Sequence, residues 1–125
     1  DRILLDVPCT GSGTLDLRPA AAPRRMEPGW VRRTVQTQKA LLKKASTLLK
    51  AGGRLVYSTC SILKEENEEV VRTVLADGRF CLIPVPGELA DQLPRLPVTL
   101  PGTLCLKPTD RYEGFFIAIL EKQKS

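Results

Sequence analysis

The sequence has 125 residues, of which 42% are hydrophobic and 26% are charged, a composition typical of one globular domain or part of one. Its net charge of +5 is compatible with an acidic partner such as nucleic acid, and equally with a basic protein that binds none. Histidine is absent, which excludes a Cys-His or Ser-His dyad within the chain, and no apolar run approaches the roughly 18 residues of a membrane span.

The chain opens on a predicted strand, Ile3 to Val7, whose mainly apolar residues are typical of a strand buried on both faces of a parallel sheet. Because this strand begins within the first three residues, we expect the N-terminal part of its domain to be missing. Residues 1–125 would then be the C-terminal part. Residues 10–13 predict a tight turn, and residues 16–29 an irregular basic loop rich in proline and alanine.

Val31 to Ala51 is predicted to be the longest helix, ended by Gly52 and Gly53 in the left-handed position that glycine favours. Its basic side chains lie mostly off the apolar face, and their plainest interpretation is a solvated surface. Residues at 3.6-residue spacing form that apolar face: Val31, Val35, Gln38, Leu41, Leu42, Ala45, Leu48 and Leu49.

A central strand is predicted from Arg54 to Thr59, and it delivers Cys60 to the start of a second helix. Ser61 is placed to cap this helix, and Glu65 and Glu66 would suit the positive end of its dipole. The apolar face of this helix consists of Val70, Val71, Val74 and Leu75. The helix is predicted to end at Asp77-Gly78.

A third strand is predicted from Phe80 to Val85, followed by a proline-rich stretch that allows at most a turn of helix near residues 88–92. Leu104 to Leu106 is a short strand and Phe115 to Glu121 the last one. Strands alternating with helices predict an α/β fold with parallel pairing.

Candidate site residues stand where two of the predicted strands end: Asp6 and Cys9 after the first, and Cys60 after the central one. Ligands of α/β sheets bind at the carboxyl ends of strands, and a helix N-terminus lowers a thiol pKa, which favours Cys60 as a reactive thiol. With Cys81 and Cys105, the cysteines are scattered and form no C-x-x-C pair. We therefore expect reduced cysteines, no metal site and a cytoplasmic location.

Three motifs together carry a family resemblance: Asp6-Val-Pro-Cys-Thr-Gly-Ser-Gly13, then Tyr57-Ser-Thr-Cys-Ser61, then Glu65-Glu-Asn-Glu68. Gln38 and the closing Gly114-Phe-Phe-Ile-Ala118 fit the same layout. The chain thus resembles the C-terminal half of the catalytic domain of the Sun-domain family of RNA (cytosine-C5) methyltransferases.

The resemblance implies part of a Rossmann-like fold that uses S-adenosyl-L-methionine, with the last strand antiparallel between the central and third strands. It implies that Cys60 adds to C6 of cytosine and that Cys9 assists loss of the C5 proton and release of the adduct. Asp6 would lie between cofactor and base. The implied partner is RNA, ribosomal RNA more than transfer RNA, with no membrane and no metal.

The sequence also departs from the family pattern at three places. The family's glycine-rich turn for the cofactor has no match here. Asp16-Leu17 stand where the family often has two basic residues. The segment Asp110 to Glu113 lacks the histidine that is often found there. DNA cytosine methyltransferases use the Pro-Cys cysteine as nucleophile, which would assign that role to Cys9. The chain is also compatible with a non-catalytic basic RNA-binding fragment, or with a different thiol enzyme that relies on an external base.

Overall fold

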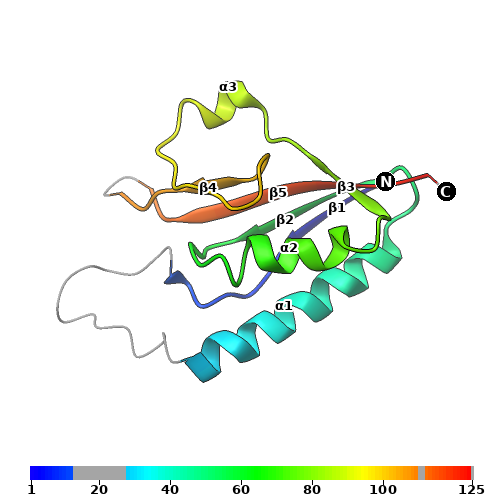
Figure 1. The fold of residues 1–125 in the computed structure, drawn as a ribbon, viewed down its shortest axis with the longest axis horizontal. Helices are drawn as coiled ribbons and strands as arrows, with labels where there is room; N and C mark the ends of the chain where they lie inside the picture. The colour runs from blue at the N-terminus through cyan, green and yellow to red at the C-terminus, as the bar shows by residue number, and fades with distance from the viewer. Residues whose placement is uncertain (13–27, 110–111, 125) are drawn as a thin grey trace.

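The computed structural model describes residues 1–12, 28–109 and 112–124, so most of the predicted basic loop at 16–29 lies outside the described residues. Figure 1 shows the elements in their order along the chain. They are β1 (Arg2–Asp6), α1 (Pro28–Leu48), β2 (Arg54–Thr59), α2 (Glu68–Leu75), β3 (Phe80–Ile83), α3 (Gly87–Ala90), β4 (Leu104–Leu106) and β5 (Phe115–Lys122).

The strands form one mixed sheet in the order β1-β2-β5-β3. β1 runs parallel to β2, and β5 is antiparallel to both β2 and β3, between which it lies. β4 pairs with the first residues of β5, while β3 pairs with its last ones. The predicted α/β fold, with an antiparallel last strand inserted between the central and third strands, is confirmed.

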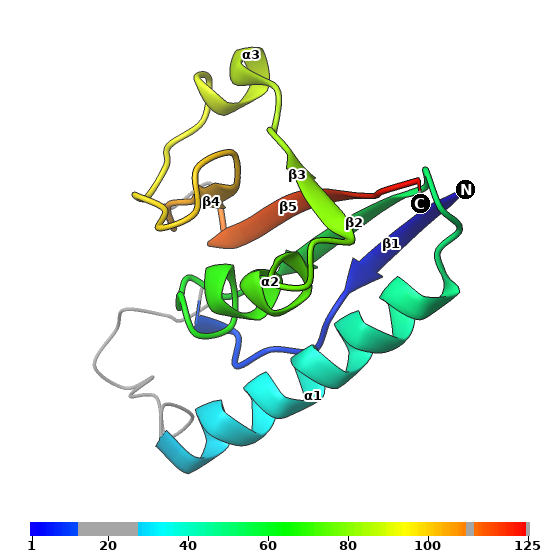
Figure 2. The same cartoon turned by 45° about the vertical axis from the view of Figure 1, so that its right-hand side comes forward.

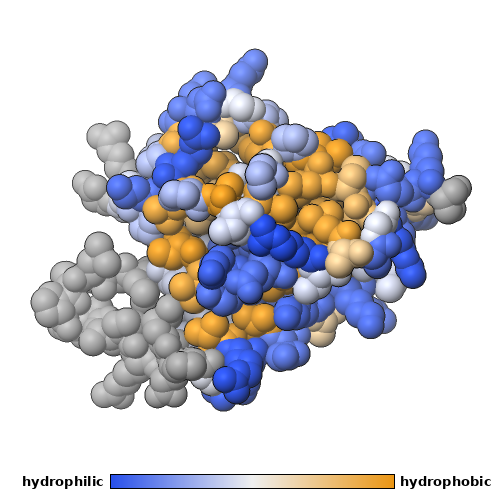
Figure 3. Space-filling model, viewed as in Figure 1, coloured by the Kyte–Doolittle hydropathy of each residue, from blue (hydrophilic) through white to orange (hydrophobic). Residues whose placement is uncertain are grey.

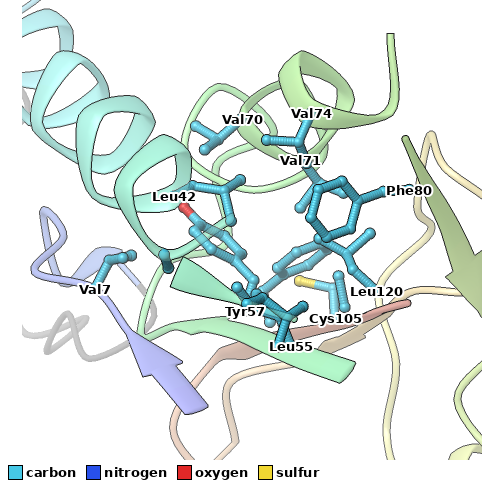
Figure 4. Packing of buried hydrophobic residues seen from close by; sticks show 14 residues of the cluster. Val7, Leu42, Leu55, Tyr57, Val70, Val71, Val74, Phe80, Cys105 and Leu120 are labelled. Atoms are coloured by element: carbon cyan, nitrogen blue, oxygen red, sulfur yellow. The ribbon is translucent and has the colours of Figure 1, made fainter. Parts of the chain in front are cut away.

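Helices α1 and α2 cover the same face of this sheet, as the two views in Figures 1 and 2 show. Figure 4 shows apolar side chains from the helices and the strands converging in the space between them. The largest fully buried ones include Leu42 of α1, Tyr57 of β2, Val71 of α2 and Phe116 of β5. The rings of Tyr57 and Phe116 meet edge to face, with centroids 6.3 Å apart.

The prediction that the first strand is buried on both faces is wrong. β1 is an edge strand that pairs only with β2 among the described strands, and its exposure alternates along its length. Ile3 and Leu5 pack against the core, whereas Leu4 is 75% exposed. Composition alone cannot separate these cases, because an apolar run is equally compatible with cover on one face or on two.

Helix α1 begins earlier and ends earlier than predicted, and its buried stripe is narrower. Leu41 is 37% exposed and Leu48 is 64% exposed, although both were predicted to face the core. The buried members are Gln38, Leu42, Ala45 and Leu49. Gly52 adopts the predicted left-handed conformation, with φ of +81°, but it lies in the turn at residues 51–52 and does not end the helix, which stops at Leu48.

The second helix does not start beside Cys60. α2 begins at Glu68, and residues 64–67 form turns before it. Ser61 therefore caps no helix, and its hydroxyl instead accepts the backbone N–H of Leu63 at 3.0 Å. Glu66 precedes the helix, and its side chain is fully buried. It therefore makes tertiary contacts and does not act as the predicted partner of the helix dipole.

The segment between β3 and β4 carries α3 and forms a projection that points away from α1 and α2 (Figure 1). It is tied to the rest of the chain by the side chain of Glu68, which accepts hydrogen bonds from the backbone N–H and the hydroxyl of Thr99. On the face in Figure 3, apolar side chains gather between α2 and this projection, bordered by hydrophilic ones.

The C-terminal end of α1 has no basic residue in its last turn, and β5 supplies the missing cation. Lys122 donates from Nζ to the backbone carbonyls of Ser46 at 2.8 Å and Leu49 at 2.9 Å. Cations near a helix C-terminus compensate the partial negative charge of its free carbonyls. This contact therefore fastens the end of α1 to the sheet.

We expect Lys122→Met to lower the free energy of unfolding by about 1–2 kcal/mol, because two helix carbonyls lose a charged donor. Equilibrium urea unfolding followed by circular dichroism measures the change. Lys43→Met is the matched control, since Lys43 is exposed on the same helix. Equal effects of the two substitutions would contradict the role given to Lys122.

Candidate active site

The carboxyl ends of β1 and β2 lie side by side because the two strands are parallel and in register, Asp6 opposite Ser58. The hydroxyl of Ser58 donates to Oδ1 of Asp6 at 3.0 Å, and the backbone N–H of Val7 donates to the carbonyl of Ser58 at 3.1 Å. The carboxylate of Asp6 is thus held in place at the sheet edge while the residue stays exposed.

The two loops that leave these strand ends bring Cys9 and Cys60 together. Both cysteines are half-buried and free, and Cys9 lies close enough to Cys60 to raise the pKa of its thiol. The backbone N–H groups of Gly11 and Cys60 lie near the sulfur of Cys9 and favour its thiolate. The structure therefore assembles at one place all three residues that the sequence singled out, Asp6, Cys9 and Cys60.

Both thiols have a raised pKa. For Cys60 the largest cause is desolvation, followed by the nearby Cys9, Asp6 and Glu113. Desolvation also dominates at Cys9, where the two backbone N–H groups partly offset it and the charges of Glu66 and Asp6 add to it. The expectation that a helix N-terminus lowers the pKa of Cys60 is wrong, because α2 starts eight residues further on.

The pH dependence of thiol alkylation follows from these shifts. Only the thiolate reacts, so a pKa raised above the ordinary 9.0 moves the reaction of Cys60 to higher pH. We expect iodoacetamide to modify Cys60 more slowly in the folded chain than in urea at pH 8, with the two rates converging at strongly alkaline pH. Peptide mass spectrometry measures both rates. If the midpoint of the alkylation profile of Cys60 lay at the same or a lower pH in the folded chain than in urea, the raised pKa would be contradicted.

A buried carboxylate, which the sequence indicated only as a helix-dipole partner and as part of the third motif, lies behind the two cysteines. Glu66 is fully buried, and Oε1 accepts the backbone N–H of Thr10 at 2.8 Å and the side-chain amide of Gln38 at 3.1 Å. Oε2 accepts the hydroxyl of Thr10 at 2.6 Å and also the hydroxyl of Ser61. The position of Gln38 on the apolar face of its helix, predicted from helical spacing, was a further signal in the sequence for a buried polar contact here.

Further hydrogen bonds extend this network along both loops. The hydroxyls of Ser12 and Ser61 lie 2.9 Å apart, and the hydroxyl of Ser12 accepts the backbone N–H of Ile62. Thr59 donates to the side chain of Asn67 at 2.6 Å, and Asn67 donates back to the carbonyl of Ser61 at 2.8 Å. The conformations of the two cysteine loops are thus fixed mutually, by side chains that are polar but buried.

This arrangement can present a sulfur nucleophile, a second thiol and a carboxylate to a ligand at the open edge of a sheet. Among the described residues, no group of three or more His, Cys, Asp or Glu side chains could hold a metal ion. In the same residues, no helix is long and apolar enough to cross a membrane. The chemistry that these side chains offer is that of thiols and one carboxylate.

Solved structures resemble the whole described fold. A methyltransferase homolog from Pyrococcus horikoshii superimposes with a TM-score of 0.76 and 34% identity, over 98% of this chain and 39% of that one. NSun6 from the same organism, crystallised with SFG, gives a TM-score of 0.78 and 31% identity, over 98% of this chain and 30% of that one. The chain therefore has part of a Rossmann-like methyltransferase fold.

A family model described as 16S rRNA methyltransferase RsmB/F matches residues 1–121. The chain belongs to this family, whose Sun domain the sequence motifs had indicated. Ribosomal RNA small subunit methyltransferase B of Sodalis glossinidius is 36% identical over 98% of this chain and 26% of its own length. The mouse 28S rRNA (cytosine-C(5))-methyltransferase is 38% identical over 98% of this chain and 17% of its own length.

The chain spans about a quarter or less of the length of these curated relatives. Much of what those proteins contain therefore has no counterpart in the 125 residues.

Proposed function

We propose that residues 1–125 are the C-terminal part of the catalytic domain of a methyltransferase that modifies C5 of cytosine in ribosomal RNA. One observation carries this proposal: Cys60 and Cys9 come together just beyond the carboxyl ends of adjacent parallel strands, next to Asp6, close enough for Cys9 and Asp6 to raise the pKa of Cys60. A relative named as a cytosine-C5 methyltransferase supports the choice of reaction. Small-subunit rRNA methyltransferases among the relatives support the choice of RNA.

Cys60 is the proposed nucleophile. Its thiolate forms a bond from sulfur to C6 of the cytosine, which makes C5 electron-rich enough to accept a methyl group. The raised pKa of Cys60 reflects in part the neighbouring carboxylate of Asp6. A cytosine inserted between the two separates them and removes that contribution, so the thiol becomes easier to ionise once the substrate is in place.

Cys9 is the proposed partner in the second half of the reaction. After methyl transfer the proton on C5 must leave, and the bond between C6 and sulfur must break to return the Cys60 thiolate. The thiol of Cys9 lies beside that of Cys60 and is close enough to assist both events. Positioned groups that transfer protons in this way contribute about 10²–10⁴ in rate.

Asp6 is the proposed contact to the cofactor or to the N3 edge of the cytosine. Ser58 donates to Oδ1 of Asp6, while the residue itself is exposed, so the carboxylate can accept a hydrogen bond from a bound amino group. Asp6 would hold one edge of S-adenosyl-L-methionine, whose bound form supplies an electrophilic methyl group. The structure of NSun6 with SFG, an analogue of that cofactor, supports this choice.

RNA is the proposed partner, and the target cytosine must leave its stack to reach the thiol. Unstacking costs a few kcal/mol, so a loop or splayed nucleotide is favoured over a paired one. The exposed basic residues of α1, Arg32, Arg33, Lys43 and Lys44, are compatible with an RNA phosphate backbone. Four free cysteines are consistent with a reduced, cytoplasmic location.

The test is methyl transfer from labelled S-adenosyl-L-methionine to ribosomal RNA by the complete protein that carries this chain. We expect label in 5-methylcytosine, identified by mass spectrometry of digested RNA, and little or none with residues 1–125 alone. Robust methylation by residues 1–125 would contradict their assignment as part of a domain. RNA binding without any methylation by the complete protein would favour a non-catalytic RNA-binding role.

A further inference from the structure

Glu66 is the most completely enclosed ionisable group at the candidate site. It has no exposed surface, and its carboxylate accepts four hydrogen bonds, two at each oxygen. A carboxylate buried without such donors would cost several kcal/mol. Glu66 is therefore held in one position by its surroundings, and it holds them in turn.

Three of the four donors to Glu66 come from the immediate neighbours of the two cysteines. Thr10 follows Cys9 in the chain, and Ser61 follows Cys60, so one carboxylate joins the two loops directly behind their thiols. Gln38 donates both to Glu66 and to the carbonyl of Pro8, at 3.0 Å, which ties the residue before Cys9 to α1. No other described carboxylate accepts hydrogen bonds from both loops.

The two oxygens of Glu66 face donors of different kinds. Oε1 meets a backbone N–H and an amide NH₂, which can only donate. Oε2 meets two hydroxyl groups, which can rotate to accept instead. A glutamine at this position therefore keeps every hydrogen bond by placing its NH₂ toward the hydroxyls, whereas aspartate is one methylene too short.

We propose that Glu66 is the positioning residue that sets the separation of Cys9 and Cys60, through its hydrogen bonds to Thr10 and Ser61. Its negative charge is a separate property: it raises the pKa of the Cys9 thiol, after the larger effect of burial. The catalytic meaning of this role rests on the proposed function. The geometric role itself can be measured without RNA or cofactor.

The readout is the electrostatic coupling between the thiols. Cys9 raises the pKa of Cys60, so its replacement in Cys9→Ala is expected to lower that pKa. The shift occurs only in a protein whose loops place residue 9 beside Cys60, and it therefore reports their separation. The pKa of Cys60 is measured in the full chain from the pH profile of its alkylation, with and without Cys9→Ala. Each variant at position 66 is then tested for whether Cys9→Ala still produces the shift.

We expect Glu66→Gln to keep the coupling while lowering the pKa of Cys9, since geometry is retained and charge is lost. Glu66→Asp, which keeps the charge and loses the reach, is expected to lose the coupling. Glu69→Gln is the matched control, because Glu69 is exposed in the first turn of α2 and the same charge is removed. Circular dichroism verifies that each variant is folded.

A folded Glu66→Asp variant with undiminished coupling would overturn the proposal, as would loss of coupling in Glu66→Gln equal to that in Glu66→Asp. In the complete protein, misplacement of a catalytic group is expected to lower kcat about 100-fold with KM unchanged. Absence of methylation in the unsubstituted protein would instead contradict the proposed function, while the measured coupling of the two thiols would still support the positioning role of Glu66. The two failures are thereby distinguishable.

Discussion

Replacing Cys60 with alanine is expected to abolish covalent capture of RNA and to lower methylation by at least about 10⁴-fold, since loss of a nucleophile removes the bond on which the reaction depends. The complete protein is incubated with ribosomal RNA and S-adenosyl-L-methionine, and the adduct is resolved by denaturing electrophoresis. Methylation is followed in parallel by label transfer. Neither measurement should detect more than a trace of activity with Cys60→Ala.

The control for Cys60→Ala is Cys81→Ala. Cys81 is also a half-buried free cysteine, but it lies on β3, opposite Glu121 of β5 and away from the strand ends that carry the site. The Cys81→Ala variant should form adduct and transfer label like the unsubstituted protein. Adduct that persists in Cys60→Ala and disappears in Cys9→Ala would transfer the role of nucleophile to Cys9, as in DNA cytosine methyltransferases.

Replacing Cys9 with alanine is expected to give the opposite result, an accumulated adduct with turnover lowered by about 10²–10⁴-fold. Two physical effects act in the same direction. Release of the adduct loses its assisting thiol, and formation of the adduct becomes easier because Cys9 no longer raises the pKa of Cys60. The same electrophoresis measures it, with the amount of adduct at steady state compared across pH.

The pH dependence separates this result from a general loss of structure. Because the pKa of Cys60 falls in Cys9→Ala, adduct formation should reach its plateau at lower pH than in the unsubstituted protein. A variant whose loops were merely disordered would form less adduct at every pH. Less adduct in a folded Cys9→Ala variant at all pH values would contradict the assisting role of Cys9.

The sequence was sufficient for those features that depend on neighbouring residues. The bounds of the central strand and of the short strand at 104–106 agree with the structure, because β-branched and apolar runs between glycine and proline are local signals. The left-handed conformation of Gly52 was predicted for the same reason, although the helix before it ends at Leu48. The position of the last strand, between β2 and β3, came from the family resemblance, since periodicity carries no information on strand order.

The start of α2 shows where local reasoning failed. An acidic stretch after Ser61 is a valid helix signal, yet the chain makes turns there and begins the helix at Glu68. The reason is tertiary: Glu66 accepts hydrogen bonds from Thr10 and Gln38, which are distant in sequence, as well as from Ser61, and these bonds compete with its use in a helical first turn. No window of neighbouring residues contains all of those donors.

By itself, then, the sequence determined the class of fold, the family and the three candidate residues Asp6, Cys9 and Cys60, because motifs and hydrophobic patterns are written along the chain. Only the tertiary structure decided that Leu4 is exposed, that the thiols have a raised pKa and that Glu66 joins the two cysteine loops. Burial and electrostatic environment are sums over residues brought together by folding, and they cannot be read from the order of residues alone.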